Sequence, residues 1–512
     1  MKRISYIIIL FFLAGISACT KKLDQQAVSD VPSSAFYKTP NDFLQGVNGV
    51  YYRLRAYPTQ ASWMREVRSD NLAVTSDGNR DWQGINDFSP NLTTTAFIVG
   101  AWDNDFNGIY NANIVLNAIA TKGASVISDS LAKRYNGEVR FLRAFYYFDL
   151  LRYYGKLPIV DTVMSVSDVS NVPRSPVADV YNFIIQDLQF AINALPAAWG
   201  NADLGRPTSY SAKGLLGLVY LTKSGPTYGI DGGPGLDSKE YDKALAQFND
   251  IINSGKYTFS PDYPSIFSYT NEDNKEVLFD IQAVSTTNGA EFPSQLIPDA
   301  YWTGLGLQNY GNGYGSASYN VTRDLMQSYR WSAVPGSGII DVRDTFSINH
   351  AYRTSTSSAA LDTTRPFIKK YVNVALRGKD RADWPINWIV MRYTDVLMMK
   401  AECILHGAAG GTQTDVNNIV NQVRKRAGVP LLTTNVDLPT LMEERRREFL
   451  GEGLRWDDLV REGMAVNTMN TWRVSDNITT IHQVVPQYII YPVPQAEILA
   501  KPGLYDQNAG YY

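Results

Sequence analysis

The sequence predicts a mainly α-helical protein, built from tetratricopeptide-like helix pairs in a degenerate solenoid, with an irregular, loop-rich insertion region that carries short strands. Apolar residues recur at helical spacing over residues 41–256 and again over 387–512. Between these parts, residues 257–386 are rich in turn-forming residues and show little sustained periodicity. Ala244 is followed four residues later by the large aromatic Phe248. This spacing is typical of tetratricopeptide-type helix pairs.

Residues 1–18 are predicted to be a lipoprotein signal peptide. A short positive region precedes an almost wholly apolar run over residues 4–16, and two small residues stand directly before Cys19. The run is too short to span a bilayer comfortably, and its flanks are those of a secretory signal. Cleavage would leave Cys19 as an acylated first residue, so residues 19–40 are read as a lipidated tether. The alternative is an ordinary cleaved signal in which the cysteine stands by chance.

The helices of the N-terminal part, residues 41–256, follow from their apolar spacing. The segments 41–55 and 102–120 each carry apolar residues at intervals of three and four. Small residues in segment 211–225 allow a partner helix to approach closely, and segment 241–257 supplies an apolar face. The sequence therefore predicts a close helix pair at the end of this part.

The most aromatic segment, residues 137–160, is predicted to be a buried helix rather than a ligand platform. Its Phe, Leu and Tyr residues cover most of the helical circumference, and a helix that is apolar nearly all round is a buried one. Gly155 is placed to end it, and Pro158 forces an extended exit. Its arginines are expected to pair with carboxylates from neighbouring helices. They are Arg140, Arg143, Arg152 and, just before the segment, Arg134.

The C-terminal part, residues 387–512, is predicted to be helical and packed on the same fold. Helices are expected over 387–407, 413–427 and 438–463. The tail from residue 491 is extended and punctuated by proline, and is expected to lie over the surface.

Composition excludes several classes of function. The chain has 512 residues, of which 45% are hydrophobic, and is long enough to bury a large core. A formal net charge of -3 argues against a general nucleic-acid binder. The two cysteines, Cys19 and Cys403, cannot form a disulfide framework, and Cys403 reads as an inert core thiol. The three histidines lack metal-ligand spacing, so no metal site and no cofactor are expected, while a structural calcium ion is left open.

The carboxylate-rich run over residues 443–462 is the obvious place to look for catalysis. Glu443 and Glu444 stand four and three residues before Arg447, which is the spacing of a salt-bridged helix. A glycoside hydrolase needs two carboxyl groups facing each other across a sugar, and nothing in this run predicts that arrangement. The protein is therefore expected not to be an enzyme.

Two loops carry the composition that a sugar-binding surface needs. An aromatic ring offers a flat apolar face to the C–H groups of a sugar, and amides and carboxylates can satisfy its hydroxyls. Segments 76–88 and 299–315 combine aromatic residues with Asn, Asp, Gln and Gly, and glycine lets the backbone approach a ligand closely. The candidate ligand-binding residues are Trp82, Tyr301, Trp302, Tyr310 and Tyr314.

Five segments resemble the SusD/RagB family of outer-membrane lipoproteins, in the order in which that family carries them. Together with the lipoprotein cysteine they make the resemblance cover nearly the whole mature chain. Ala509 stands where the family usually has proline, and Lys501 where asparagine is common. The segments are "FLRAFYYFDLLRYYGKLPIV" (141–160), "WIVMRYTDVLMMKAECIL" (388–405), "VNNIVNQVRKRAG" (416–428), "ERRREFLGEGLRWDDLVREG" (444–463) and "YPVPQAEILAKPGLYDQNAGYY" (491–512).

The resemblance implies a role as well as a fold. Such proteins are lipid-anchored on the outside of the outer membrane, capture oligosaccharide there, and deliver it to a TonB-dependent, SusC-like barrel transporter without covalent chemistry. In this chain Cys19 would carry the lipid. The family's ligand aromatics vary with the substrate, so the five candidate residues rest on loop composition alone.

Two other functions stay open at this point. One is a tetratricopeptide-type scaffold lipoprotein that binds peptide or protein in a concave helical groove, for which loops 76–88 and 300–320 would be dispensable. The other is a glycoside hydrolase, which would need turnover and a pair of essential carboxylates.

Overall fold

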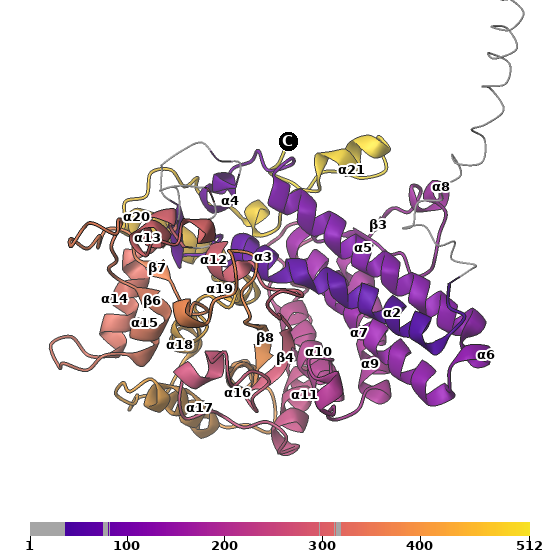
Figure 1. The fold of residues 1–512 in the computed structure, drawn as a ribbon, viewed down its shortest axis with the longest axis horizontal. Helices are drawn as coiled ribbons and strands as arrows, with labels where there is room; N and C mark the ends of the chain where they lie inside the picture. The colour runs from indigo at the N-terminus through magenta and orange to yellow at the C-terminus, as the bar shows by residue number, and fades with distance from the viewer. Residues whose placement is uncertain (1–35, 75–79, 81, 296, 312, 314–318) are drawn as a thin grey trace, which may run out of the picture.

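Helices make up most of the structure, and the strands are short and paired two by two (Figure 1). The computed structural model describes residues 36–512, apart from 75–79, 81, 296, 312 and 314–318. Buried side chains form one main core that extends from Tyr37 to Tyr511. Within the described residues, no helix is both long and apolar enough to cross a membrane. The predicted fold class, mainly helical with a few short strands, is confirmed.

Successive helices pack side by side to form the main stack. Its members are α2 (Pro40–Tyr51), α5 (Ala96–Ala118), α7 (Asp129–Tyr154), α9 (Val177–Ala194), α10 (Ser209–Ser224), α11 (Tyr241–Asn253), α16 (Tyr393–Leu405) and α17 (Gln413–Arg426). From α5 onward each helix contacts the next in this series, and α11 contacts α16 directly. The residues between α11 and α16 therefore form an insertion between two neighbouring helices of the stack.

Shorter elements connect the N-terminal helices. They are η1 (Tyr52–Ala56), α3 (Tyr57–Ala61), η2 (Ser62–Glu66), β1 (Leu72–Val74), α4 (Gln83–Asp87), η3 (Ile119–Gly123), α6 (Ala124–Val126), β2 (Leu157–Pro158), α8 (Val166–Val169), β3 (Arg174–Ser175) and η4 (Asn201–Asp203).

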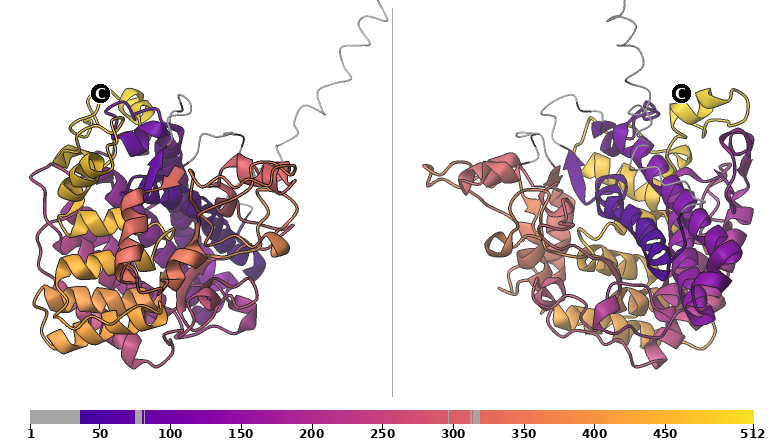
Figure 2. Two further views of the ribbon diagram at one scale, coloured as in Figure 1. Left: turned by 90° about the vertical axis from the view of Figure 1, so that its left-hand side faces the viewer. Right: turned by 45° about the vertical axis from the view of Figure 1, so that its right-hand side comes forward.

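The insertion is built from short helices and strands. A large part of it, drawn in pink to salmon, projects from one side of the helical body (Figure 2). Its elements are η5 (Pro264–Phe267), β4 (Val277–Ile281), α12 (Phe292–Gln295), α13 (Asp299–Gly304), η6 (Gln308–Tyr310), β5 (Tyr319–Val321), α14 (Arg323–Ser332), α15 (Val342–Ser347), β6 (Ile348–Asn349), β7 (Phe367–Ile368), η7 (Val374–Leu376) and β8 (Trp388–Arg392).

Antiparallel pairing ties the insertion to the rest of the chain. Strand β1 pairs with β5, with Leu72 opposite Val321, and β4 pairs with β8. The other pairs are β2 with β3 and β6 with β7. The β1–β5 pair joins the N-terminal helices to the middle of the insertion, and so fixes where its loops lie.

The helix predicted from residue 387 begins later, because residues 388–392 form strand β8. The segment is rich in aromatic and β-branched residues and follows Pro385, features that favour an extended start. Its backbone is paired with β4, and the helix proper starts at Tyr393. An apolar run alone does not separate a buried strand from a buried helix.

The helix predicted over 438–463 is divided in two. Gly451 and Gly453 adopt φ of 78° and 69°, a left-handed conformation that interrupts the helix. At Gly453 a Cβ atom would lie 2.8 Å from the Cβ of Ala61, so a larger residue would push the two segments apart. The C-terminal elements are α18 (Leu438–Glu448), α19 (Arg455–Arg461), α20 (Ala465–Ser475), η8 (Pro486–Ile489) and α21 (Gln495–Ala500).

Helix α7 is buried as its sequence predicts. Its residues from Phe141 to Tyr154 are all buried. Gly155 ends the helix with φ of 72°, and a Cβ there would lie 2.0 Å from the carbonyl oxygen of Gly232. The predicted pairing of its arginines is confirmed, for example by the 2.7 Å contact of Arg143 Nε with Asp187 Oδ2. The aromatic segment therefore belongs to the hydrophobic core. Its resemblance to the family reflects the shared helical scaffold and not a ligand-binding surface.

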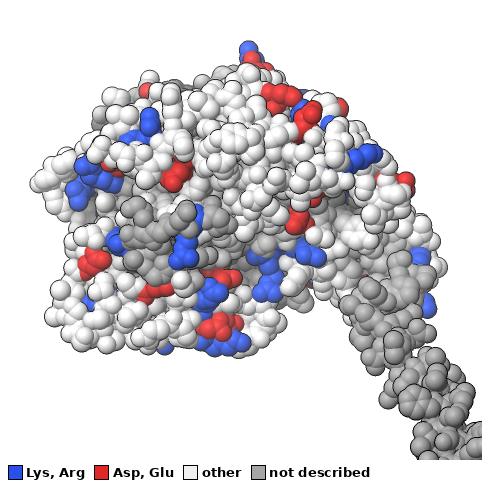
Figure 3. Space-filling view, turned by 90° about the horizontal axis from the view of Figure 1, so that it is seen from above, with Lys and Arg blue, Asp and Glu red and all other residues white. Residues whose placement is uncertain are grey.

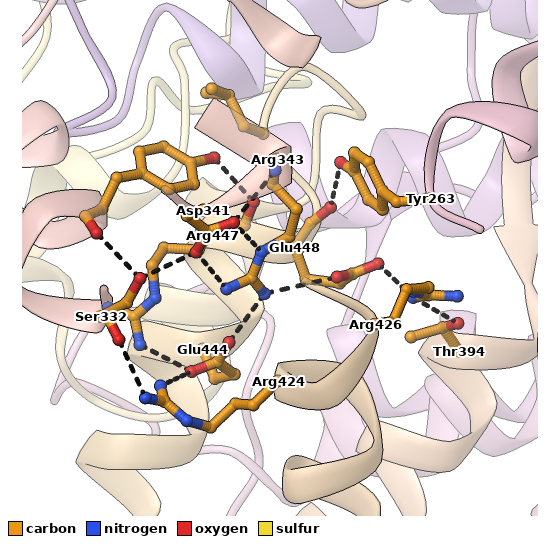
Figure 4. A network of polar contacts seen from close by, with 12 residues as sticks. Tyr263, Ser332, Asp341, Arg343, Thr394, Arg424, Arg426, Glu444, Arg447 and Glu448 are labelled. Atoms are coloured by element: carbon orange, nitrogen blue, oxygen red, sulfur yellow. Dashed lines mark hydrogen bonds and ion pairs between the residues drawn. The ribbon is translucent and has the colours of Figure 1, made fainter. Parts of the chain in front are cut away.

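Glu444 and Glu448 of α18 belong to a buried ion network (Figure 4). Glu444 accepts from Arg447 at 2.8 Å, which confirms the predicted pair, and also from Arg424 at 2.8 Å. Glu448 accepts from Arg426 at 2.6 Å and from Arg392 at 2.8 Å. Each carboxylate is thus shared between arginines of different elements, so the network fastens α18 to α17 and β8.

Candidate functional site

Two adjoining cavities open between the N-terminal helices and the insertion. Their volumes are about 480 Å³ and 440 Å³. We call them together the Tyr52 cleft. The residues that line both cavities are Tyr52, Arg55, Ile281, Gln282 and Asn288.

Three segments form the walls of the larger cavity. One is the tight turn of η1 and α3, the second is the beginning of α5, and the third is the chain from Ile281 to Phe292 that follows β4. Gly100 of α5 lines this cavity, and a Cβ there would meet no atom within 4 Å, so that wall stays open. The cleft exists because the insertion folds back against the first helices.

The cleft offers one exposed aromatic ring among side-chain amides. Tyr52 is 60% exposed and lies where the two cavities adjoin. Gln60 is 5% exposed, and its Oε1 has no hydrogen-bond donor among the described residues. Asn104 and Asn288 add further amides to the lining. An aromatic face and amide groups around an open groove suit a ligand with both C–H faces and hydroxyl groups.

Tyr52 was not among the residues selected from the sequence. The signal was present, because Phe43, Val47 and Val50 define the buried face of α2 and Tyr52 falls outside it. An aromatic residue on the solvent side of an amphipathic helix lies where a ligand can reach it. A criterion based on polar, glycine-rich loops does not cover such a helical position.

The strands that flank the two loops selected from the sequence are paired with each other. Pairing of β1 with β5 brings the chain before residue 76 next to the chain after residue 318. Across this junction Trp63 contacts Trp82 and Tyr319, with ring centroids 5.0 Å apart in both cases. Phe97, which lines the cleft, stacks on Trp63 at 4.3 Å. The aromatic cluster around Trp82 therefore supports the wall of the cleft from behind.

The positions of the selected aromatic residues differ from what the sequence suggested. Trp82, Trp302 and Tyr310 are 2%, 0% and 3% exposed, so their ring faces are covered and do not meet the expectation of a stacking surface. Trp302 packs against Tyr310 and Trp384, with centroids 5.5 Å and 5.8 Å away. Glycine-rich loops here let aromatic rings turn inward, which composition alone does not reveal.

Tyr301 is half-buried against Trp302, Tyr352 and Phe367 and does not line the Tyr52 cleft. Tyr314 and Cys19 lie outside the described residues. Direct ligand contact by the selected aromatic residues stays a prediction for Tyr314 and Tyr301, and lipidation of Cys19 stays a prediction as well.

Asp280 lines the smaller cavity, and its carboxyl group is buried. The pKa of its carboxyl group is raised to about 7, first by burial and then by the neighbouring Asp273 carboxylate, against the opposing effect of hydrogen bonds from Gln282 and Asn387. Among the described residues, no group of three or more His, Cys, Asp or Glu side chains is arranged to hold a metal ion.

Asp280 is expected to make the stability of the protein depend on pH. Its pKa is above the ordinary value of 3.8, so the folded protein holds a proton that the unfolded chain has lost. Stability from this group is complete below about pH 4 and is lost as the pH rises towards about 7. In the wild type, this group is expected to lower the free energy of unfolding by roughly 1 kcal/mol per pH unit across that window. Asp280→Asn is expected to remove this contribution. Urea unfolding at pH 5, 6 and 7 tests this, and identical slopes for variant and wild type would refute it.

Two family models match this chain. One, described as the SusD family, matches residues 339–511. The other, described as "Starch-binding associating with outer membrane", matches residues 23–221. The chain belongs to the SusD/RagB family. The SusD-family match begins inside the insertion at residue 339 and continues through the C-terminal helices, and the other match covers the N-terminal helices up to residue 221.

Relatives of the SusD family align with most of the chain. A SusD-like protein from Bacteroides ovatus is 27% identical over 378 residues, which cover 70% of this chain and 65% of that protein. SusD-like protein P2 from Formosa agariphila is 25% identical over 547 aligned residues, covering 99% of both chains. The structure is similar to that of surface glycan-binding protein A from Bacteroides thetaiotaomicron in complex with laminarihexaose, with a TM-score of 0.75 and 23% identity, covering 92% of this chain and all of the other. At this identity the structural match shows the shared fold.

Proposed function

We propose that this protein is a cell-surface lipoprotein that binds an oligosaccharide in the Tyr52 cleft and delivers it to a TonB-dependent, SusC-like barrel transporter. The observation that carries the proposal is the exposed ring of Tyr52 at the junction of two amide-lined cavities. The SusD-family relationship supports it, because a solved neighbour is a glycan-binding protein in complex with laminarihexaose.

The proposed mechanism is capture and hand-over without covalent chemistry. Tyr52 would stack on a sugar ring, while the half-buried amides of Asn104 and Asn288 would bond to its hydroxyls. These steps need no cofactor. Acylation of Cys19 would hold the protein at the outer membrane, where it would meet both the polysaccharide and the transporter.

Tyr52→Ala is expected to weaken oligosaccharide binding at least about tenfold, which corresponds to about 1.4 kcal/mol. The variant removes the exposed ring from both cavities and leaves the buried face of α2 untouched. Titration calorimetry of the full chain in detergent, against plant, host and microbial oligosaccharides, measures the change.

Tyr110→Ala is the matched control for this experiment. Tyr110 is also a half-exposed helical tyrosine, on α5, and it lines a different cavity. Loss of binding in Tyr110→Ala with full binding in Tyr52→Ala would move the site away from the Tyr52 cleft. The same mixtures are expected to contain unchanged oligosaccharide after prolonged incubation, and shortened products would favour a glycoside hydrolase.

A further inference from the structure

Arg55 occupies the junction of the Tyr52 cleft and is not engaged by any acid there. It lies in η1 and lines both cavities. Its guanidinium carbon is 5.4 Å from the centroid of the Tyr52 ring. Within the part of the chain that the structure describes, its one hydrogen bond is a long contact of 3.4 Å from Nη2 to the carbonyl oxygen of Gly289. Among the described residues, no carboxylate forms an ion pair with it.

Arg206, the other arginine that lines the cleft, is paired with carboxylates, unlike Arg55. Arg206 lines the smaller cavity and is held by Glu138 at 2.6 Å and by Asp203 at 3.0 Å. Its donors are directed to these carboxylates, so it is part of the scaffold. Arg55 keeps most of its donors available for a ligand.

The acidic groups of the cleft do not neutralise Arg55. Glu291 lines the larger cavity and pairs with Arg381 at 3.4 Å. Asp280 lines the smaller one and directs its carboxyl group to Gln282 and Asn387. On the face seen in Figure 3, acidic and basic side chains are interspersed among a majority of uncharged residues. A ligand attracted to the cleft by charge would meet that charge at Arg55, since Arg206 is paired with carboxylates.

We infer that the Tyr52 cleft takes an anionic oligosaccharide, and that Arg55 binds a carboxylate or sulfate group on the sugar that stacks on Tyr52. The inference rests on the proposed function and names its substrate class. A guanidinium presents a planar fork of donors that matches both anions, and such charge-assisted bonds are about twice as strong as neutral ones. Because Arg55 lies beside the Tyr52 ring, one monosaccharide can touch both.

The experiment compares each charged oligosaccharide with its own neutral form. Calorimetry on the full chain in detergent uses galacturonate and other uronate-containing oligosaccharides with their methyl esters, and sulfated galactan oligosaccharides with their desulfated forms. The charged member of the preferred pair is expected to bind at least about tenfold more tightly at low salt, with the advantage shrinking as ionic strength rises. The uronate and sulfate arms separate the two possible anions.

Variants then locate the effect. Arg55→Gln is expected to lower the affinity for the charged member at least about tenfold more than the affinity for the neutral form, and so to remove the preference. Arg55→Lys is expected to keep part of the preference, because it retains the charge and loses the fork. Arg330→Gln is the control, since Arg330 is exposed on α14 away from the cleft, and it is expected to change nothing.

Two results would overturn the inference. Equal binding of charged and neutral members, unaffected by Arg55→Gln, would refute the anionic substrate class while the proposed function stands. Absence of binding to every oligosaccharide tested would contradict both the substrate class and the proposed function.

Discussion

Replacing Glu448 by glutamine is expected to lower the free energy of unfolding by about 3–5 kcal/mol. The Glu448 side chain is fully buried and accepts hydrogen bonds from Arg392 and Arg426. Glutamine removes the negative charge and turns one acceptor into a donor that faces a guanidinium. The arginines cannot regain water where they lie, so their charge is left buried and uncompensated.

Guanidinium chloride is unsuitable for this measurement because it screens ion pairs, so urea unfolding is used. Asp250→Asn provides the comparison, because Asp250 is 54% exposed in its pair with Lys213. This variant is expected to lower the free energy of unfolding by less than about 1 kcal/mol. Equal small effects of the two variants would show that the buried network contributes no more than a surface pair.

The effect of Glu448→Gln is also expected to depend on pH. Burial alone would raise the pKa of Glu448, but the charges of Arg426, Arg392 and Arg343 lower it below its ordinary value of 4.5. A carboxyl group with a lowered folded-state pKa contributes stability above its unfolded pKa and loses it as the pH falls. The difference between wild type and variant should therefore be complete above about pH 4.5 and shrink in more acidic solution.

Trp302→Ala is expected to lower the free energy of unfolding by about 3–5 kcal/mol. The Trp302 side chain is fully buried between Tyr310 of η6 and Trp384 of the segment before β8, and these short, separate segments cannot easily close the space. Thermal or urea unfolding measures the loss. At a temperature where the variant is folded, its oligosaccharide affinity should match the wild type, because Trp302 does not line the Tyr52 cleft.

Trp331→Ala is the control for this prediction. Trp331 lies on α14 and is 65% exposed, so its removal leaves no cavity and should change stability by less than about 1 kcal/mol. A stable Trp302→Ala variant that no longer binds oligosaccharide would support the prediction from the sequence that Trp302 contacts the ligand.

The helical stack could be predicted because each helix carries its own periodic pattern. In α7 the apolar residues surround the helix and Gly155 ends it, and both features are visible in the sequence. The pairs of Glu444 and Arg447 likewise follow from spacing within one helix. Such predictions succeed because the interacting residues are close along the chain.

Predictions failed where distant segments decide local structure. Residues 388–392 carry an apolar run that suits a helix or a strand, and the presence of β4 beside them selects the strand. Residues 438–463 divide at Gly451 and Gly453, because α19 must turn to pack on the N-terminal segment that contains Ala61. Neither partner can be identified from the segment itself.

The sequence by itself determined the fold class, the buried character of the aromatic helix and the SusD-family relationship, because these rest on local periodicity and on motifs in a fixed order. Only the tertiary structure decided which aromatic residues reach solvent. Trp82 and Trp302 share a polar, glycine-rich neighbourhood with true surface residues, yet long-range packing buries them. Tyr52 and Arg55 come from the first helical segment and Gln282 from the insertion, about 230 residues later in the chain, yet all three line one cleft. Exposure is a property of the whole packed molecule, so no single segment encodes it.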